Sequence, residues 1–120
     1  MDGARELVAK RAGRVVVVAG ADFAHVGPRF GDRAAYDAGQ RASLESRDRG
    51  SLDAAIQKKG DAFWAHVIED LESRRVCGLA PIWSLLEVLP DASRGDVVHY
   101  EQTIDAEDGS IVSHAGVVFS

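Results

Sequence analysis

"VVVVAGADFAHVGPRFG", residues Val15 to Gly31, is the stretch on which the prediction of the fold depends. Its four consecutive valines show no polar alternation, which indicates a strand over residues 14–20 that is buried on both faces. Such a strand is typical of the centre of a sheet, usually a parallel one, that helices cover. The glycines and the proline that follow predict a loop over residues 21–31, at the strand's carboxyl end, where α/β sheets bind their ligands.

This predicted loop carries three side chains that can support chemistry: Asp22, His25 and Arg29. An aspartate and a histidine three residues apart can act as orienting group and general base, or can serve a metal ion, since a carboxylate fixes the tautomer of an imidazole. The alternative is structural, with Asp22 capping the turn and His25 packing at the surface. The spacing alone does not decide between the two.

The composition is that of one globular domain, with 120 residues of which 46% are hydrophobic and 28% are charged. We therefore assign residues 1–120 to a single domain. The net charge is −5 and basic residues are interspersed with acidic ones, so the sequence lacks the basic stripe of a nucleic-acid-binding protein. No apolar run approaches the ~20 residues that span a membrane. A single cysteine excludes an intrachain disulfide and favours a cytoplasmic location.

Helices are predicted on both sides of the first strand in the sequence. A weak apolar stripe predicts a short helix over residues 2–12. Residues 33–50 show no clear period and are predicted as a loop with at most one helical turn, and the charged part of this loop is predicted to face solvent. Capping residues and apolar spacing then predict helices that start at Ser51, at Asp61 and just after Gly78.

The carboxyl-terminal segments 96–105 and 110–120 alternate as strands do, and an Asp-Gly pair between them favours a hairpin turn. With the predicted helices, this gives an α/β fold in which helices flank a mixed sheet. The alternation places His99 on the face of Val97 and Glu101, and His114 on the face of Val112. We assign no role to these two histidines, and the tryptophans of the helices are predicted to pack in the core.

Cys77 is predicted to lie just before the amino terminus of a helix. Backbone N–H groups and the helix dipole stabilise a thiolate there, and the thiolate is the form of cysteine that binds a metal ion. The alternative is an inert cysteine that packs as a small hydrophobic residue. The sequence contains no C-x-x-C or H-E-x-x-H motif that would complete a site around it.

Four segments occur in an order that resembles the Memo-like family, which includes the AmmeMemoRadiSam system protein B of bacteria and archaea. The segments are DFAHVGPRFG (22–31), LDAAIQKKGDAFWAHV (52–67), VCGLAPIWSLLE (76–87) and YEQTIDAEDGSIVSHAGVVF (100–119). Each segment alone is weak evidence, and the resemblance rests on their order and spacing. It covers the chain from about Val15 to Phe119.

The resemblance implies a fold similar to the carboxyl-terminal half of the Memo-like fold, which is related to the class III extradiol dioxygenases, a group of non-haem iron enzymes. It implies a cluster of histidines and a cysteine that binds iron or copper, so Cys77 and His25 become candidate metal ligands and Asp22 and His25 candidate catalytic residues. Two further histidine ligands of the family belong to an amino-terminal half that this sequence does not contain. His114 stands where the family usually has a tyrosine.

Two functions of different classes follow from these observations. The first is a metal-binding redox protein of the dioxygenase-like type, truncated and inactive alone, or completed by a second copy or by the missing half. The alternative is a non-catalytic module that binds a peptide or an anion through Arg29 and the loop N–H groups. The resemblance also implies two partners, a radical S-adenosylmethionine protein and an AMMECR-type protein.

Overall fold

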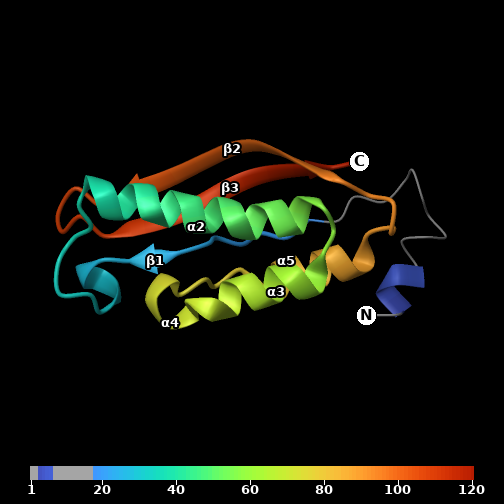
Figure 1. Ribbon diagram of the computed structural model, residues 1–120, viewed down its shortest axis with the longest axis horizontal. Helices are drawn as coiled ribbons and strands as arrows, with labels where there is room; N and C mark the ends of the chain where they lie inside the picture. Colours follow the sequence, from blue (N-terminus) through green and yellow to red (C-terminus); the bar gives the residue numbers. More distant parts are fainter. Residues whose placement is uncertain (1–2, 7–17) are drawn as a thin grey trace.

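The computed structural model describes residues 3–6 and 18–120 (Figure 1). Residues 3–6 are helical, as predicted for the segment 2–12. The rest of that segment and most of the predicted strand 14–20 lie outside the described residues. The last part of the strand prediction, residues 18–20, is wrong, because these residues do not belong to a strand.

Three strands form one antiparallel sheet within the described ranges, in the order β1, β3, β2 (Figure 1). The hairpin prediction is confirmed by β2 (Gly95–Ile104) and β3 (Ile111–Phe119). The turn between them closes with a hydrogen bond from the Asp105 N–H to the Ser110 carbonyl (2.8 Å), and it contains Gly109 at φ 73°, a conformation that favours glycine. The predicted fold class, helices flanking a sheet, is confirmed.

The first strand, β1 (His25–Val26), lies inside the segment 21–31 that was predicted as a loop. That part of the prediction is wrong. The physical reason is burial, because Phe23, Ala24 and Val26 all place apolar side chains in the core. His25 therefore lies on a strand that pairs with β3 and not on a loop beyond a strand end.

Helix α2 (Ala38–Ile56) contradicts the prediction of a loop over residues 33–50. A capping box starts this helix: Asp37 Oδ1 accepts from the Gln40 N–H (2.8 Å), and the Gln40 side chain accepts from the Asp37 N–H (2.9 Å). Ser51 was predicted to cap a helix but lies fully buried inside α2. The buried face of the helix mixes apolar and polar residues: Leu44, Asp48, Ser51, Leu52 and Ala55. This mixture hides the helical period.

Three further helices follow, α3 (Gly60–Glu69), α4 (Leu71–Arg74) and α5 (Leu79–Val88). The predictions of α3 and α5 are confirmed, although Lys59 and not Asp61 is the N-cap residue of α3. Helices α2, α3 and α5 pack on the same face of the sheet (Figure 1). Within the part of the chain that the structure describes, no helix is both long and apolar enough to cross a membrane.

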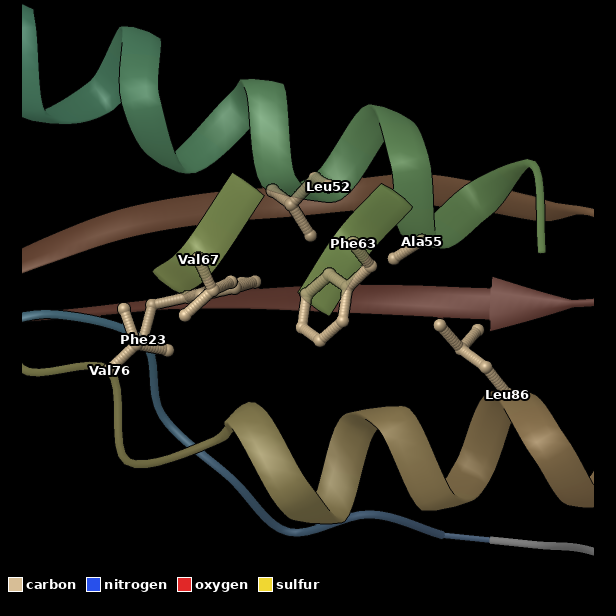
Figure 2. Packing of buried hydrophobic residues seen from close by; sticks show 7 residues of the cluster. All are labelled: Phe23, Leu52, Ala55, Phe63, Val67, Val76 and Leu86. Carbon is tan, nitrogen blue, oxygen red and sulfur yellow. The ribbon is translucent and has the colours of Figure 1, made fainter. Parts of the chain in front are cut away.

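The main core lies between these helices and the sheet (Figure 2). Phe63 of α3 is fully buried at its centre, and its ring points into the space between α2 and α5 (Figure 2). Trp64 was predicted as a core residue but is 40% exposed, and it meets Trp83 of α5 edge-on, with ring centroids 5.9 Å apart. The cluster comprises Phe23, Leu52, Ala55, Phe63, Val67, Val76 and Leu86.

A register shift in the hairpin changes which residues share a face of β2. Val97 pairs with Val117 but His99 pairs with Gly116, so β2 contains one extra residue, a β-bulge. His99 therefore faces away from the core beside Glu101, with His99 Nε2 and Glu101 Oε2 3.1 Å apart, whereas Val97 packs against the core. The prediction that His99 shares a face with Val97 is wrong.

Candidate functional site

His25 is held in a way that leaves one ring nitrogen open. Its Nδ1 lies 3.1 Å from the carbonyl oxygen of Arg75, and its ring meets Phe30 edge-on with centroids 5.1 Å apart. A carbonyl oxygen only accepts, so Nδ1 carries the proton and the neutral ring presents the lone pair of Nε2. Among the described residues Nε2 has no hydrogen-bond partner. This tautomer suits both a metal ligand and a proton acceptor.

Arg75 in turn holds the backbone of His25. Its Nη1 donates to the His25 carbonyl oxygen (3.0 Å), and its Nη2 donates to Asp32 Oδ1 (2.9 Å). Asp32 Oδ2 also accepts from the Gly27 N–H at 2.7 Å, which closes the loop after β1. The hydrogen bond from Arg75 lowers the pKa of Asp32 against the opposing effect of burial, and the Gly27 N–H and the Arg75 charge lower it further.

Cys77 lies directly before Gly78, the N-cap residue of α5, as predicted. The cysteine is exposed, which contradicts the alternative of a core residue. Its Sγ lies 3.6 Å from the carbonyl oxygen of Asp22, a residue 55 positions earlier. A Cβ on Gly78 would lie 2.4 Å from the same oxygen, so this close approach requires glycine. The structure thus brings Asp22 and Cys77 together.

The carboxylate of Asp22 is not the partner that orients His25. Asp22 is exposed, and no hydrogen bond between its carboxylate and the His25 ring is present among the described residues. The carbonyl of Arg75, which the sequence analysis did not single out, takes that position. Asp22 therefore lies at the rim of the candidate site, beside Cys77.

Arg29, the candidate anion-binding residue, is occupied by acidic partners. Its guanidinium pairs with the carboxylate of Asp105, and its Nε lies 3.9 Å from Asp108 Oδ2. Its main-chain N–H donates to Ser110 Oγ at 2.9 Å. Two carboxylates from the hairpin turn thus surround one positive charge, an arrangement that disfavours binding of an anion.

Within the described residues, no group of three or more His, Cys, Asp or Glu side chains is arranged to hold a metal ion. His25 and Cys77 are therefore at most part of a ligand set. An apolar groove of about 460 Å³ lies beside α5 and the end of β3, but neither of these two residues nor Asp22 lines it. The candidate site is thus a surface site and not a deep cavity.

A second polar cluster lies in the core, and none of its residues was among the site residues predicted from the sequence. Arg74 is fully buried, and its guanidinium donates to Asp48 Oδ1 (2.9 Å), Asp70 Oδ1 (2.9 Å) and Ser51 Oγ (3.0 Å). The hydroxyl of Tyr100 donates to the other oxygen of Asp48 at 2.7 Å. These contacts join α2, α4 and β2, and every nitrogen of the Arg74 guanidinium donates a hydrogen bond.

This cluster also affects the titration of Tyr100. Burial raises the pKa of its phenol, and the hydrogen bond to Asp48 raises it further. The signal in the sequence that points to the cluster is the capping pair of Asp37 and Gln40, which predicts a helix through residue 48. A helix there would place Asp48 and Ser51 on the same face as Leu44 and Leu52.

Two comparisons with known proteins agree with each other. A family profile described as "Memo-like protein" matches residues 4–118. A "MEMO1 family protein" of Aquifex aeolicus (strain VF5) is 28% identical over 106 residues, which are 87% of this chain and 27% of the relative. The chain thus spans about a quarter of the length of this relative. His25, Cys77 and their partners Asp32 and Arg75 all lie in the range that the profile matches.

Proposed function

The chain belongs to the Memo-like family, and on this premise we propose that His25 and Cys77 supply two ligands to a redox-active metal ion, iron or copper. The observation that carries the proposal is the hydrogen bond between His25 Nδ1 and the Arg75 carbonyl, because it leaves the lone pair of Nε2 open. The exposed thiol of Cys77 follows only two residues after Arg75. An imidazole and a thiolate are ligands that suit both metals.

Cys77 precedes α5, a helix of ten residues, and the dipole of a helix favours a negative charge at its start. The thiol donates toward the Asp22 carbonyl oxygen, 3.6 Å from Sγ, so a bound metal ion would have to displace the thiol proton. When bound, the metal would supply redox chemistry like that of the class III extradiol dioxygenases, the enzymes to which the family resemblance points. In this proposal His25 keeps its Nδ1 proton on the Arg75 carbonyl while Nε2 faces the metal, and Asp22 is the acid–base group at the rim of the site. We assign no reaction step to the metal.

The remaining ligands would come from polypeptide that these 120 residues do not include. A second copy of the chain, or the part of a Memo-like protein that this chain does not match, could supply them. The partners that the resemblance implies, a radical S-adenosylmethionine protein and an AMMECR-type protein, belong to the same proposal. Binding of an anion through Arg29 is less well supported, since Asp105 and Asp108 already offset its charge.

Titration with Co²⁺ under reducing, anaerobic conditions tests the proposal, because cobalt bound to a thiolate absorbs in the near ultraviolet. The wild-type chain should develop this band to saturation. Cys77→Ser should abolish it, and His25→Ala should weaken the cobalt affinity by about tenfold or more. His114→Ala, which removes a histidine on the outer face of the hairpin, is the matched control and should leave the titration unchanged.

Two outcomes contradict the proposal. One is the absence of any cobalt band that depends on Cys77. The other is an affinity in His25→Ala equal to that of His114→Ala. Elemental analysis of the purified protein then distinguishes iron from copper.

A further inference from the structure

The geometry points to a role for Arg75 and Asp32 as positioning residues of the candidate site, which fix the tautomer and the orientation of His25. This inference rests on the proposed function, but it concerns the chain itself and can be tested without metal. Arg75 is distant in the sequence from the other two residues, 50 positions after His25 and 43 after Asp32. We call the three residues that these contacts join, His25, Asp32 and Arg75, the Arg75 clasp.

In the Arg75 clasp, the side chains of His25 and Arg75 each donate a hydrogen bond to the main-chain carbonyl of the other residue. The His25 ring donates from Nδ1 to the Arg75 carbonyl (3.1 Å), and the Arg75 side chain donates to the His25 carbonyl (3.0 Å). The first bond fixes the orientation of the His25 ring, and the second holds the backbone of β1 at His25. The segment just before His25 is also bonded to β3, from the Phe23 N–H to the Ser113 carbonyl (2.8 Å) and from the Ser113 N–H to the Ala24 carbonyl (3.0 Å), so the contact from Arg75 adds to those of the sheet.

The backbone of Arg75 explains why its carbonyl faces the ring. Arg75 is the C-cap residue of α4 with φ 52° and ψ 55°, a left-handed conformation that glycine adopts more easily. Its neighbour Arg74 is fully buried and fixes α4 to the core. Arg74 therefore fixes the position of the helix end at which the Arg75 turn begins. Because the backbone alone would favour glycine, contacts of the guanidinium account for an arginine at this position.

Asp32 anchors the guanidinium. Its Oδ1 accepts from Arg75 Nη2 (2.9 Å), and its Oδ2 accepts from Arg75 Nη1 (3.3 Å) and from the Gly27 N–H (2.7 Å). The side chains of Arg75 and Asp32 are 31% and 26% exposed, so solvent screens the pair only in part. Asp32 thereby ties the loop after β1, which carries Phe30 against the His25 ring, to the same arginine.

Nuclear magnetic resonance of the ¹⁵N-labelled imidazoles in the metal-free chain tests this inference. In the wild type, His25 should be in the Nδ1–H tautomer. Asp32→Asn and Arg75→Gly should both shift it to a mixture of tautomers, because the ring loses a fixed acceptor. Arg75→Gly keeps the backbone conformation that the turn requires, and Arg75→Lys, which keeps the charge, is a milder variant for the case that glycine impairs folding.

Glu45→Gln is the matched control for Asp32→Asn. Glu45 pairs with Arg49 at 2.7 Å on the surface of α2, so its neutralisation removes the same charge elsewhere. The control should leave the His25 tautomer and the cobalt affinity unchanged, whereas Asp32→Asn should weaken the cobalt affinity by about 10- to 100-fold.

An unchanged Nδ1–H tautomer in folded Asp32→Asn and Arg75→Lys overturns the positioning role, even if cobalt binds to His25 and Cys77. A shifted tautomer in these variants supports the role, even if the wild-type chain shows no cobalt band and the proposed function fails. The two results therefore separate the inference from the function on which it builds.

Discussion

Arg74 and Arg75 are neighbours in the sequence, yet they belong to two polar clusters of opposite construction. Arg74 is fully buried, and its three guanidinium nitrogens donate to the buried Asp48 and Ser51 and to the partly buried Asp70. Arg75 is partly exposed and holds His25, whose Nε2 has no partner among the described residues. We call the Arg74 cluster the closed cluster, because its charged groups are paired with one another, and we call the His25 cluster the open cluster. The open cluster leaves the lone pair of His25 Nε2 available to bind a ligand.

Asp48→Ala tests the closed cluster with the largest expected effect. The substitution leaves the Arg74 charge buried without one of its two carboxylates, so the free energy of unfolding should fall by about 3–5 kcal/mol. Urea denaturation measures the loss. Asp53→Ala, on the exposed side of the same helix, is the control and should change the free energy of unfolding by less than about 0.5 kcal/mol. Equal effects of the two variants would show that the buried pair does not stabilise the fold.

Gly78→Ala tests the other half of the comparison, the candidate site that includes Cys77. The new Cβ would lie 2.4 Å from the main-chain oxygen of Asp22, so the chain before β1 must move away from α5. We expect a loss of about 1–3 kcal/mol in urea denaturation and a weaker cobalt affinity. Gly39→Ala is the control, because its Cβ would make only an ordinary contact with Asp37 Oδ1 at 3.4 Å, and it should not lower the free energy of unfolding. A Gly78→Ala protein with wild-type stability and affinity would contradict the close approach that places Cys77.

The alkaline stability of the protein should depend on Tyr100. The folded state raises the pKa of this phenol by burial and by the Asp48 carboxylate, so it favours the neutral form. The contribution to stability is therefore complete below the ordinary tyrosine pKa of about 10, and it is lost as the pH rises above that value. The loss should be about 1.4 kcal/mol per pH unit. Tyr100→Phe should remove this dependence, and Tyr36→Phe should retain it; the reverse pattern would be inconsistent with the closed cluster.

Arg29→Ala should have the smallest effect. An exposed ion pair such as Arg29–Asp105 contributes less than about 1 kcal/mol, and the residue belongs to neither cluster. Thermal unfolding with and without phosphate measures both its stability and its anion binding. We expect phosphate to stabilise neither protein. Phosphate that stabilises the wild type but not Arg29→Ala would favour the anion-binding module over the metal site.

Local patterns predicted most of the helices and the hairpin, but the apolar periodicity did not reveal α2, whose local signal is the capping pair at its start. Strands β2 and β3 alternate, and α5 has an apolar stripe and a proline in its first turn, so each is specified by its own residues. The buried face of α2 contains Asp48, which looks solvent-exposed in the sequence. It is acceptable in the core only because Arg74, 26 residues later, neutralises it. Such a distant partner leaves no local signal.

The candidate site, too, was predicted only in part. His25 and Cys77 were found because the histidine, the cysteine and the glycine after it stand in recognisable motifs. Asp32 and Arg75 were missed, since their roles depend on a left-handed backbone at Arg75 and on contacts across 43 and 50 positions. The wrong face for His99 has a similar cause, because a β-bulge shifts the alternation and no residue type announces it.

The difference between the two clusters can be tested in one measurement, the increase in the free energy of unfolding that saturating Co²⁺ produces in four proteins. Wild type and Asp48→Asn should show the same increase, because a ligand stabilises only through its own site. Cys77→Ser should lose it, and His25→Ala should show an increase smaller by about 1.4 kcal/mol or more, which corresponds to the tenfold weaker affinity. An equal increase in all four proteins would mean that cobalt binds elsewhere, and a loss in Asp48→Asn alone would mean that the closed cluster is the one that binds metal.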